Sequence, residues 1–129
     1  MLTLGLDLHY RPDLPALIAR WQRPVVATEL QAGYEAVRAL ADETACHRWL
    51  LDLRRRADAS DPAITTWFGQ LFLPSLRGRY AGPTRLAFLV SPLRTTEPVA
   101  LGNAPLPTDC VVATFTDEAA AYQWLQDET

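Results

Sequence analysis

The sequence contains no lysine, and all 12 of its basic residues are arginine. Without a lysine amine, the chain cannot form a Schiff base or use lysine as a general base. The lysine and the glycine-rich stretch of a phosphate-binding P-loop are also missing. The net charge of -3 argues against a nucleic-acid partner, because such binding relies on positive charge to neutralise phosphates.

Cysteines and long apolar runs are also scarce. Cys46 and Cys110 are too few for a disulfide scaffold, so we expect both to be reduced. No apolar run reaches the ~18 residues of a membrane-spanning helix. Residues 1–10 lack the basic start of a signal peptide and carry Asp7 within their apolar stretch. We therefore expect a cytoplasmic protein without a transmembrane segment.

The composition is that of an ordinary globular protein, with 49% apolar and 21% charged residues in a chain of 129. We expect a single domain over residues 1–129. Its central stretch is residues 48–56, Arg-Trp-Leu-Leu-Asp-Leu-Arg-Arg-Arg, where arginines flank a short apolar run. An apolar run without clean alternation is typical of a parallel strand that is covered on both faces.

Two strands and a helix are predicted before this stretch. Leucines alternate with other residues over 2–8, which indicates a strand with one buried face. A second strand over 14–21 should pair with it antiparallel, and Pro15 favours an edge position or a late start. Residues 28–31 (Thr-Glu-Leu-Gln) fit a capping box, so we expect a helix over 29–45.

The second half alternates helices and strands. Asp61 as N-cap and Pro62 at the first helical position predict a second helix, which should kink or restart at Pro74. The remaining predicted elements are strands over 85–90 and 111–115 and a last helix that opens at 116–118. Prolines interrupt regular structure over much of 92–109, and a loop of this length is often a functional or flexible cover.

The predicted order, β-β-α-β-α-β-β-α, indicates an α/β fold. We expect a mixed, mostly parallel sheet of about five strands, with an N-terminal antiparallel hairpin and helices packed against it. Four stretches carry a family resemblance: the strand at 48–53, the Ser60-Asp61-Pro62 helix start, residues 85–92 and the closing segment 112–125. In this order they resemble the STAS-like superfamily, typified by anti-anti-sigma factors and sulphate-transporter tails, and most closely the small bacterial SpoIIAA-like (STAS/SEC14-like) proteins.

The resemblance implies a regulatory module that binds a protein partner. In the anti-anti-sigma branch, a phosphorylatable Ser or Thr follows an Asp at the start of the helix after the central strand. Ser60 would be that phosphosite, although the spacing differs and Asp61 and Pro62 replace the small residues that usually follow. The alternative is that Ser60 is a loop residue near a helix cap.

Ligands of α/β sheets tend to bind at the carboxyl ends of the strands, which here are residues 54–61 and 91–96. The candidate binding residues are Arg54, Arg55, Arg56, Ser60, Asp61 and Trp67. The arginines and the helix N-terminus would suit a phosphate or carboxylate. The plainer interpretation is that the arginines are solvated or pair with Asp58 and Asp61.

The aromatic residues of the second helix have three interpretations. Trp67, Phe68 and Phe72 could line an apolar ligand pocket, form a dimer face, or belong to the core, and aromatic residues at helical spacing usually belong to the core.

Neither a metal site nor a catalytic set is evident. Cys46, His47 and His9 lack the spacing of zinc ligands, so we expect no metal, no cofactor and no catalysis. An enzyme would require a cleft where His9 or His47 meets a carboxylate and a nucleophile.

The leading hypothesis is a partner-binding module that acts through the edge at the start of the second helix, either alone or as a homodimer. The alternative is a carrier of a small anionic or lipid-like ligand between that helix and the 92–109 loop.

Overall fold

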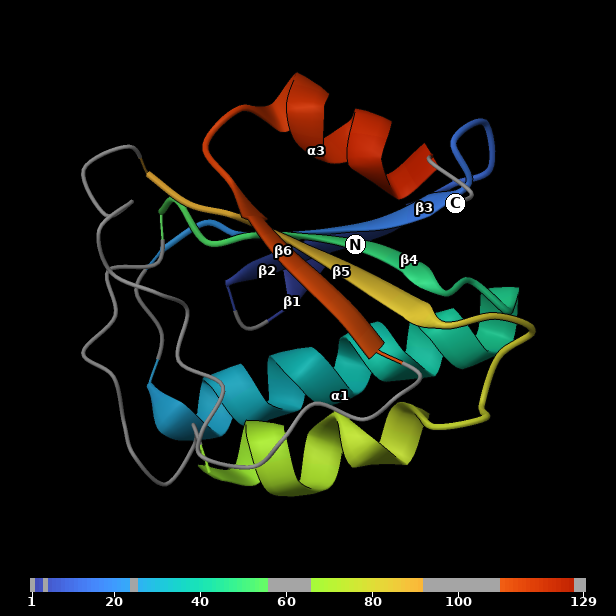
Figure 1. Cartoon of the computed structure of the whole chain (residues 1–129). Helices are drawn as coiled ribbons and strands as arrows, with labels where there is room; N and C mark the ends of the chain where they lie inside the picture. The colour runs from blue at the N-terminus through green and yellow to red at the C-terminus, as the bar shows by residue number, and fades with distance from the viewer. Residues whose placement is uncertain (1, 4, 24–25, 56–65, 92–109, 127–129) are drawn as a thin grey trace.

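A computed structural model describes residues 2–3, 5–23, 26–55, 66–91 and 110–126 of the protein. They form an α/β arrangement in which a sheet lies between helices (Figure 1). The strands are β1 (Leu2–Thr3), β2 (Leu6–Arg11), β3 (Ala16–Trp21), β4 (Arg48–Asp52), β5 (Thr84–Leu89) and β6 (Cys110–Phe115). The helical elements are α1 (Ala27–Thr44), the π-helix η1 (Phe68–Phe72), the 3-10 helix η2 (Pro74–Leu76) and α3 (Glu118–Gln126).

The six strands lie in the sheet in chain order, and β1 is only two residues long. β2 pairs antiparallel with β1 and β3, whereas β3–β4, β4–β5 and β5–β6 are parallel pairs. The α/β class, the N-terminal antiparallel hairpin and the mixed sheet are therefore confirmed. The finer assignment to the STAS-like fold stays a prediction. Within the described residues, no helix combines the length and apolar character that crossing a membrane requires.

The first predicted strand, 2–8, is divided in two. Gly5 has a φ of 76°, a left-handed conformation that glycine adopts without steric cost. The two resulting strands, β1 and β2, pair antiparallel with each other. The prediction of one strand was wrong because alternating leucines do not reveal a reversal at a single glycine. The late start after Pro15 is confirmed, since β3 begins at Ala16.

α1 begins two residues earlier than predicted. Its first residue is Ala27, and the N–H of Val26 donates to the Glu29 carboxylate at 3.2 Å. The capping box predicted at 28–31 was therefore wrong: the N-cap is Val26, and the side chain that reaches back to it is Glu29, at the third helical position. The helix ends at a left-handed Ala45, with φ 55°.

β4 is covered on both faces, as the apolar run predicts. Trp49, Leu50 and Leu51 are all 0% exposed. Trp49 and Leu51 belong to the hydrophobic cluster on the side of α1, and Leu50 belongs to the cluster on the side of α3. Burial on both faces removes the polar alternation that a half-exposed strand would show.

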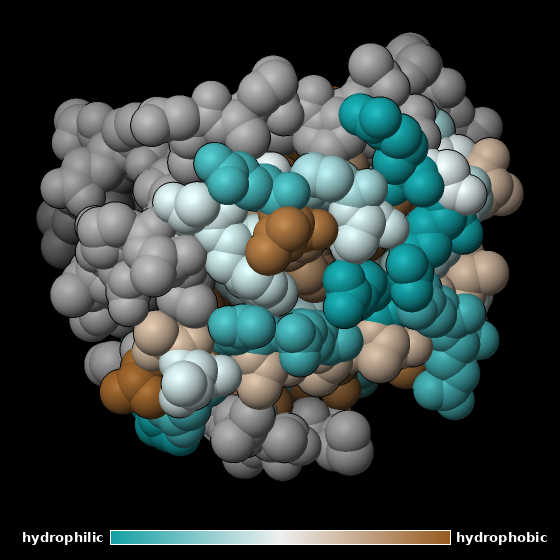
Figure 2. All heavy atoms as spheres, turned by 90° about the horizontal axis from the view of Figure 1, so that it is seen from below, coloured by the Kyte–Doolittle hydropathy of each residue, from teal (hydrophilic) through white to brown (hydrophobic). Residues whose placement is uncertain are grey.

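α1 and residues 66–76 cover one face of the sheet, and α3 covers the other (Figure 1). Tyr34 of α1 lies among aromatic rings, with ring centroids 4.6 Å from Phe68 and 5.5 Å from Phe72. Figure 2 shows the outside of this helical layer, where hydrophilic and near-neutral residues predominate and hydrophobic ones are scattered. The large exposed apolar side chains of the described residues are Val26, Leu71 and Val111. The helical layer therefore turns its aromatic side toward the sheet.

The restart predicted at Pro74 is confirmed. Proline has no N–H and cannot continue the helical hydrogen bonding. The N–H of Leu73 donates to the Phe68 carbonyl at 2.9 Å, and Pro74 then opens η2. The predicted helix start at residues 61–62 lies outside the described residues.

Candidate functional site

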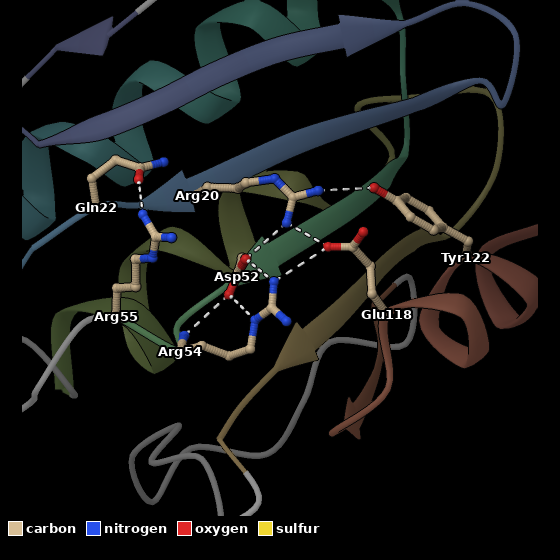
Figure 3. Close-up of polar contacts among 7 residues, drawn as sticks. All are labelled: Arg20, Gln22, Asp52, Arg54, Arg55, Glu118 and Tyr122. Atoms are coloured by element: carbon tan, nitrogen blue, oxygen red, sulfur yellow. Dashed lines mark hydrogen bonds and ion pairs between the residues drawn. The ribbon is translucent and has the colours of Figure 1, made fainter.

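Asp52, the last residue of β4, accepts four hydrogen bonds (Figure 3). Its Oδ1 accepts from the backbone N–H of Arg54 at 3.1 Å and from Arg54 Nε at 3.0 Å. Its Oδ2 accepts from Arg54 Nη2 and from Arg20 Nη1, both at 2.8 Å. The Asp52 residue is only 6% exposed. A carboxylate at this depth is tolerated because both of its oxygens are satisfied by charged or backbone donors.

Arg20 joins the sheet to α3. It lies on β3 directly opposite Asp52 in the parallel register. Its Nη1 also donates to Glu118 Oε1 at 2.5 Å, and its Nη2 donates to the Tyr122 hydroxyl at 3.2 Å. Arg54 Nη2 reaches the same Glu118 oxygen at 3.4 Å. One carboxylate of α3 therefore bridges two arginines that come from β3 and from the residues after β4.

The arrangement shifts the pKa of both central groups. Burial by itself would raise the pKa of Asp52, but hydrogen bonds from Arg54 and Arg20 outweigh it and hold that pKa below its usual value. Burial would lower the pKa of Arg20, and the hydrogen bonds to Glu118 and Asp52 instead raise it. The charged form of each group is therefore the stable one.

Arg55 differs from Arg20 and Arg54 in its partner. It is exposed, and its Nη1 donates to the Gln22 side-chain oxygen at 2.8 Å. Gln22 is fixed in turn, because its backbone N–H donates to the Gly5 carbonyl at 2.8 Å. In the part of the chain that the structure describes, Arg55 has no carboxylate partner.

A pocket of about 440 Å³ lies at this end of the sheet. It is lined by Arg20, Trp21, Gln22, Asp52, Arg54 and Arg55. These residues come from the carboxyl ends of β3 and β4 and the positions just after them, where α/β sheets commonly bind ligands. The pocket lies at the sheet edge where the sequence analysis expected a ligand, and its role as a binding site stays a prediction.

Only some of the predicted site residues line the pocket. Arg54 and Arg55 line the pocket, whereas Arg56, Ser60 and Asp61 lie outside the described residues. Trp67 is half-buried against the core, with its ring centroid 5.3 Å from that of Phe72. The neighbouring Phe68 and Phe72 are buried, which agrees with the core interpretation of these aromatic residues.

Six described residues of the site were not predicted: Arg20, Trp21, Gln22, Asp52, Glu118 and Tyr122. Arg20 is the charged position of the otherwise apolar β3, and Asp52 is one of two charged residues of β4; a charge within or at the end of an apolar strand was a usable signal. Glu118 was placed only in the opening turn of the last helix, and its contacts with Arg20 and Arg54 were not expected. Predicting that contact required knowing which face of the sheet α3 covers.

The histidines lie away from this pocket. His9 Nδ1 is 3.9 Å from Asp7 Oδ1, and His47 Nδ1 lies 3.1 Å from the Pro83 carbonyl oxygen. Cys46 is buried, its thiol donates to the Arg48 carbonyl, and burial raises its pKa. No group of three or more His, Cys, Asp or Glu that could hold a metal ion occurs within the residues described.

Comparisons of the chain with family models, with curated proteins and with solved structures found no match. The resemblance to STAS-like proteins therefore stays a prediction, and the site is interpreted from its own geometry.

Proposed function

We propose that the protein is a non-catalytic regulatory module of the STAS-like kind. It binds a protein partner through the surface around the 440 Å³ pocket that Arg55 lines. The observation that supports this most is the exposed guanidinium of Arg55, which lacks a carboxylate partner among the described residues. It stands beside a charge network that is already satisfied. An exposed arginine at a polar rim suits recognition by a partner surface.

The side chains that surround Arg55 at this surface are held in place by ion pairs. Asp52 fixes Arg54 through two side-chain hydrogen bonds, and Glu118 joins Arg54 to Arg20. A contact surface that is ordered before binding loses less conformational freedom when a partner docks. The geometry therefore supports a preformed surface.

The charge of this surface differs in sign from that of the chain. Among the described residues, the three arginines Arg20, Arg54 and Arg55 stand beside two carboxylates, Asp52 and Glu118, so these five side chains carry one positive charge in excess. The whole chain carries -3. A partner with an acidic patch would be attracted to this end of the sheet, and complementary charge mainly raises the association rate and the specificity.

The test is capture of the partner by matched charge-reversal variants. Arg55→Glu removes the positive charge from the proposed surface. Arg77→Glu makes the same change at an exposed residue just after η2, at the opposite end of the parallel strands. Tagged proteins would be recovered from cells of the source organism, and the bound proteins quantified by mass spectrometry.

We expect a protein that the wild type and Arg77→Glu enrich equally, and that Arg55→Glu captures about tenfold less, corresponding to about 1.4 kcal/mol of binding free energy. Equal capture by both folded variants would contradict the proposed surface.

The second candidate function is a carrier of a small anionic or lipid-like ligand. The 440 Å³ pocket favours it, because this volume lies within the usual range for small-molecule sites. The place first proposed for that ligand, between the second helix and the 92–109 loop, involves residues outside those described. A small molecule retained in a native mass spectrum of the protein isolated from its own cells would favour the carrier over the partner-binding module.

A further inference from the structure

We infer that the same 440 Å³ pocket, lined by Gln22 and Arg55 among others, is an oxyanion site. It takes one carboxylate or phosphate group, with Arg55 as the main contact. This inference deepens the proposed function, because it names the chemical group that the surface recognises. It rests on which hydrogen-bonding groups of the pocket are already used and which remain.

The charged acceptor of the pocket, the Asp52 carboxylate, is fully used. Each oxygen of Asp52 accepts two hydrogen bonds, from Arg54 on one side and from Arg54 and Arg20 on the other. Two bonds to each oxygen correspond to its two lone pairs. The side-chain oxygen of Gln22 accepts from Arg55 at 2.8 Å. A ligand that donates hydrogen bonds, such as an ammonium group, therefore finds both oxygens of the Asp52 carboxylate occupied and one lone pair of the Gln22 oxygen already used.

Donors remain. Arg55 uses Nη1 toward Gln22, which is its polar contact within the described residues, so Nε and Nη2 are left for a ligand. Two N–H groups on one edge of a planar guanidinium match the two oxygens of a carboxylate or phosphate. Arg54 also lines the pocket, and it directs Nε and Nη2 at Asp52. The pocket therefore offers N–H groups to an acceptor-rich group.

Asp52 is a positioning residue in this account. Together with Glu118 it neutralises Arg54 and Arg20, and its own hydrogen bonds fix their guanidinium planes, so that Arg55 carries the excess charge among these side chains. A site with one excess charge suits a single oxyanion. The group could belong to an acidic side chain of a partner protein or to a free small molecule, and both present the same oxygens to Arg55.

Nuclear magnetic resonance titration of the full chain with inorganic phosphate and with acetate tests this inference. At constant ionic strength we expect saturable shifts of the Gln22 side-chain amide and of Arg55 Nε–H, and the same titration with chloride should give none. Arg55→Gln should weaken binding at least about tenfold, because it removes the main charge-assisted contact. Arg77→Gln at the opposite end should bind like the wild type.

A second variant, Gln22→Glu, keeps the test valid if Arg55→Gln changes the fold. Gln22→Glu is nearly isosteric and places a carboxylate against Arg55, so it should weaken phosphate and acetate binding to a similar extent. The absence of saturable shifts in the wild type, or unchanged binding in both variants, would overturn the oxyanion site.

The source of the oxyanion is decided by competition. If phosphate displaces a captured protein partner from the wild type, the oxyanion is a group of that partner. If phosphate binds at Arg55 without displacing any partner, the site takes a small molecule, and the proposed partner surface fails while the oxyanion site stands. Partner capture that depends on Arg55, without phosphate or acetate binding, would overturn this inference and leave the proposed function intact.

Discussion

Asp52 shows how one residue can be buried with its charge retained. Its carboxylate receives hydrogen bonds from Arg54 and Arg20, of which the arginine side chains are 41% and 25% exposed. A charge at 6% exposure without such partners would be strongly unfavourable. Asp52 therefore stabilises the fold through its partners, and that contribution can be measured.

Asp52→Asn should destabilise the protein by about 2 kcal/mol at pH 7. The asparagine keeps the shape but loses the charge that holds Arg54 and Arg20. We place the cost below the roughly 3–5 kcal/mol of fully buried pairs, because both arginines remain partly solvated. Urea denaturation of the two proteins measures it, and an equal free energy of unfolding would contradict the assigned role.

The contribution of Asp52 should depend on pH. Its pKa in the folded protein is lowered from the ordinary 3.8, so the folded state favours the ionised form. The stability that it supplies is therefore fully present above pH 3.8 and is lost as the pH falls through the lowered folded pKa. The difference between the wild type and Asp52→Asn should shrink over that range, whereas a difference independent of pH would argue for a purely steric role.

At the scale of single residues, the sequence predicted where Arg54 and Arg55 lie but not which side chains contact them. Arg54 and Arg55 follow an apolar strand, and that was enough to place them at the carboxyl end of the sheet. The expected acidic partners were Asp58 and Asp61, which are close in sequence. The partner found for Arg54 on α3 is Glu118, which no local pattern indicates.

The helices and strands were predicted well where a local feature of the sequence determines them. β4 was evident from its apolar run, and the break at Pro74 followed from the missing N–H. The division of residues 2–8 at Gly5 was missed, because a single glycine in an alternating segment is compatible with both a strand and a turn. Local ambiguity of this kind is settled by pairing between strands.

Residues 66–76 give a test at the scale of the element. Phe72 is 1% exposed and contacts the rings of Tyr34, Trp49 and Trp67. Phe72→Ala should cost about 3–5 kcal/mol, because it leaves a cavity between the helical layer and the sheet. Chemical denaturation measures this loss.

The matched control is the adjacent Leu71→Ala. Leu71 is 65% exposed, so its truncation should change the free energy of unfolding by no more than about 0.5 kcal/mol. Similar losses for the two variants would contradict the orientation of this segment.

At the scale of the whole molecule, the site depends on parts of the chain that are far apart. Arg20 and Glu118 are separated by 98 positions in the sequence, and they meet because α3 covers the face of the sheet opposite α1 (Figure 1). The sequence order predicts the strands and helices but not the face that the last helix covers. The α/β class could therefore be predicted, whereas the bridge between β3, β4 and α3 could not.

The central claim is that a partner docks at the carboxyl ends of β3 and β4. The most direct measurement is amide hydrogen exchange of the protein alone and in complex with its captured partner. The account predicts slower exchange on binding around Gln22 and Arg54–Arg55, with no change around Arg77–Ala81 at the opposite end of the parallel strands. Protection confined to 77–81, with exchange near Arg55 unaffected, would contradict it.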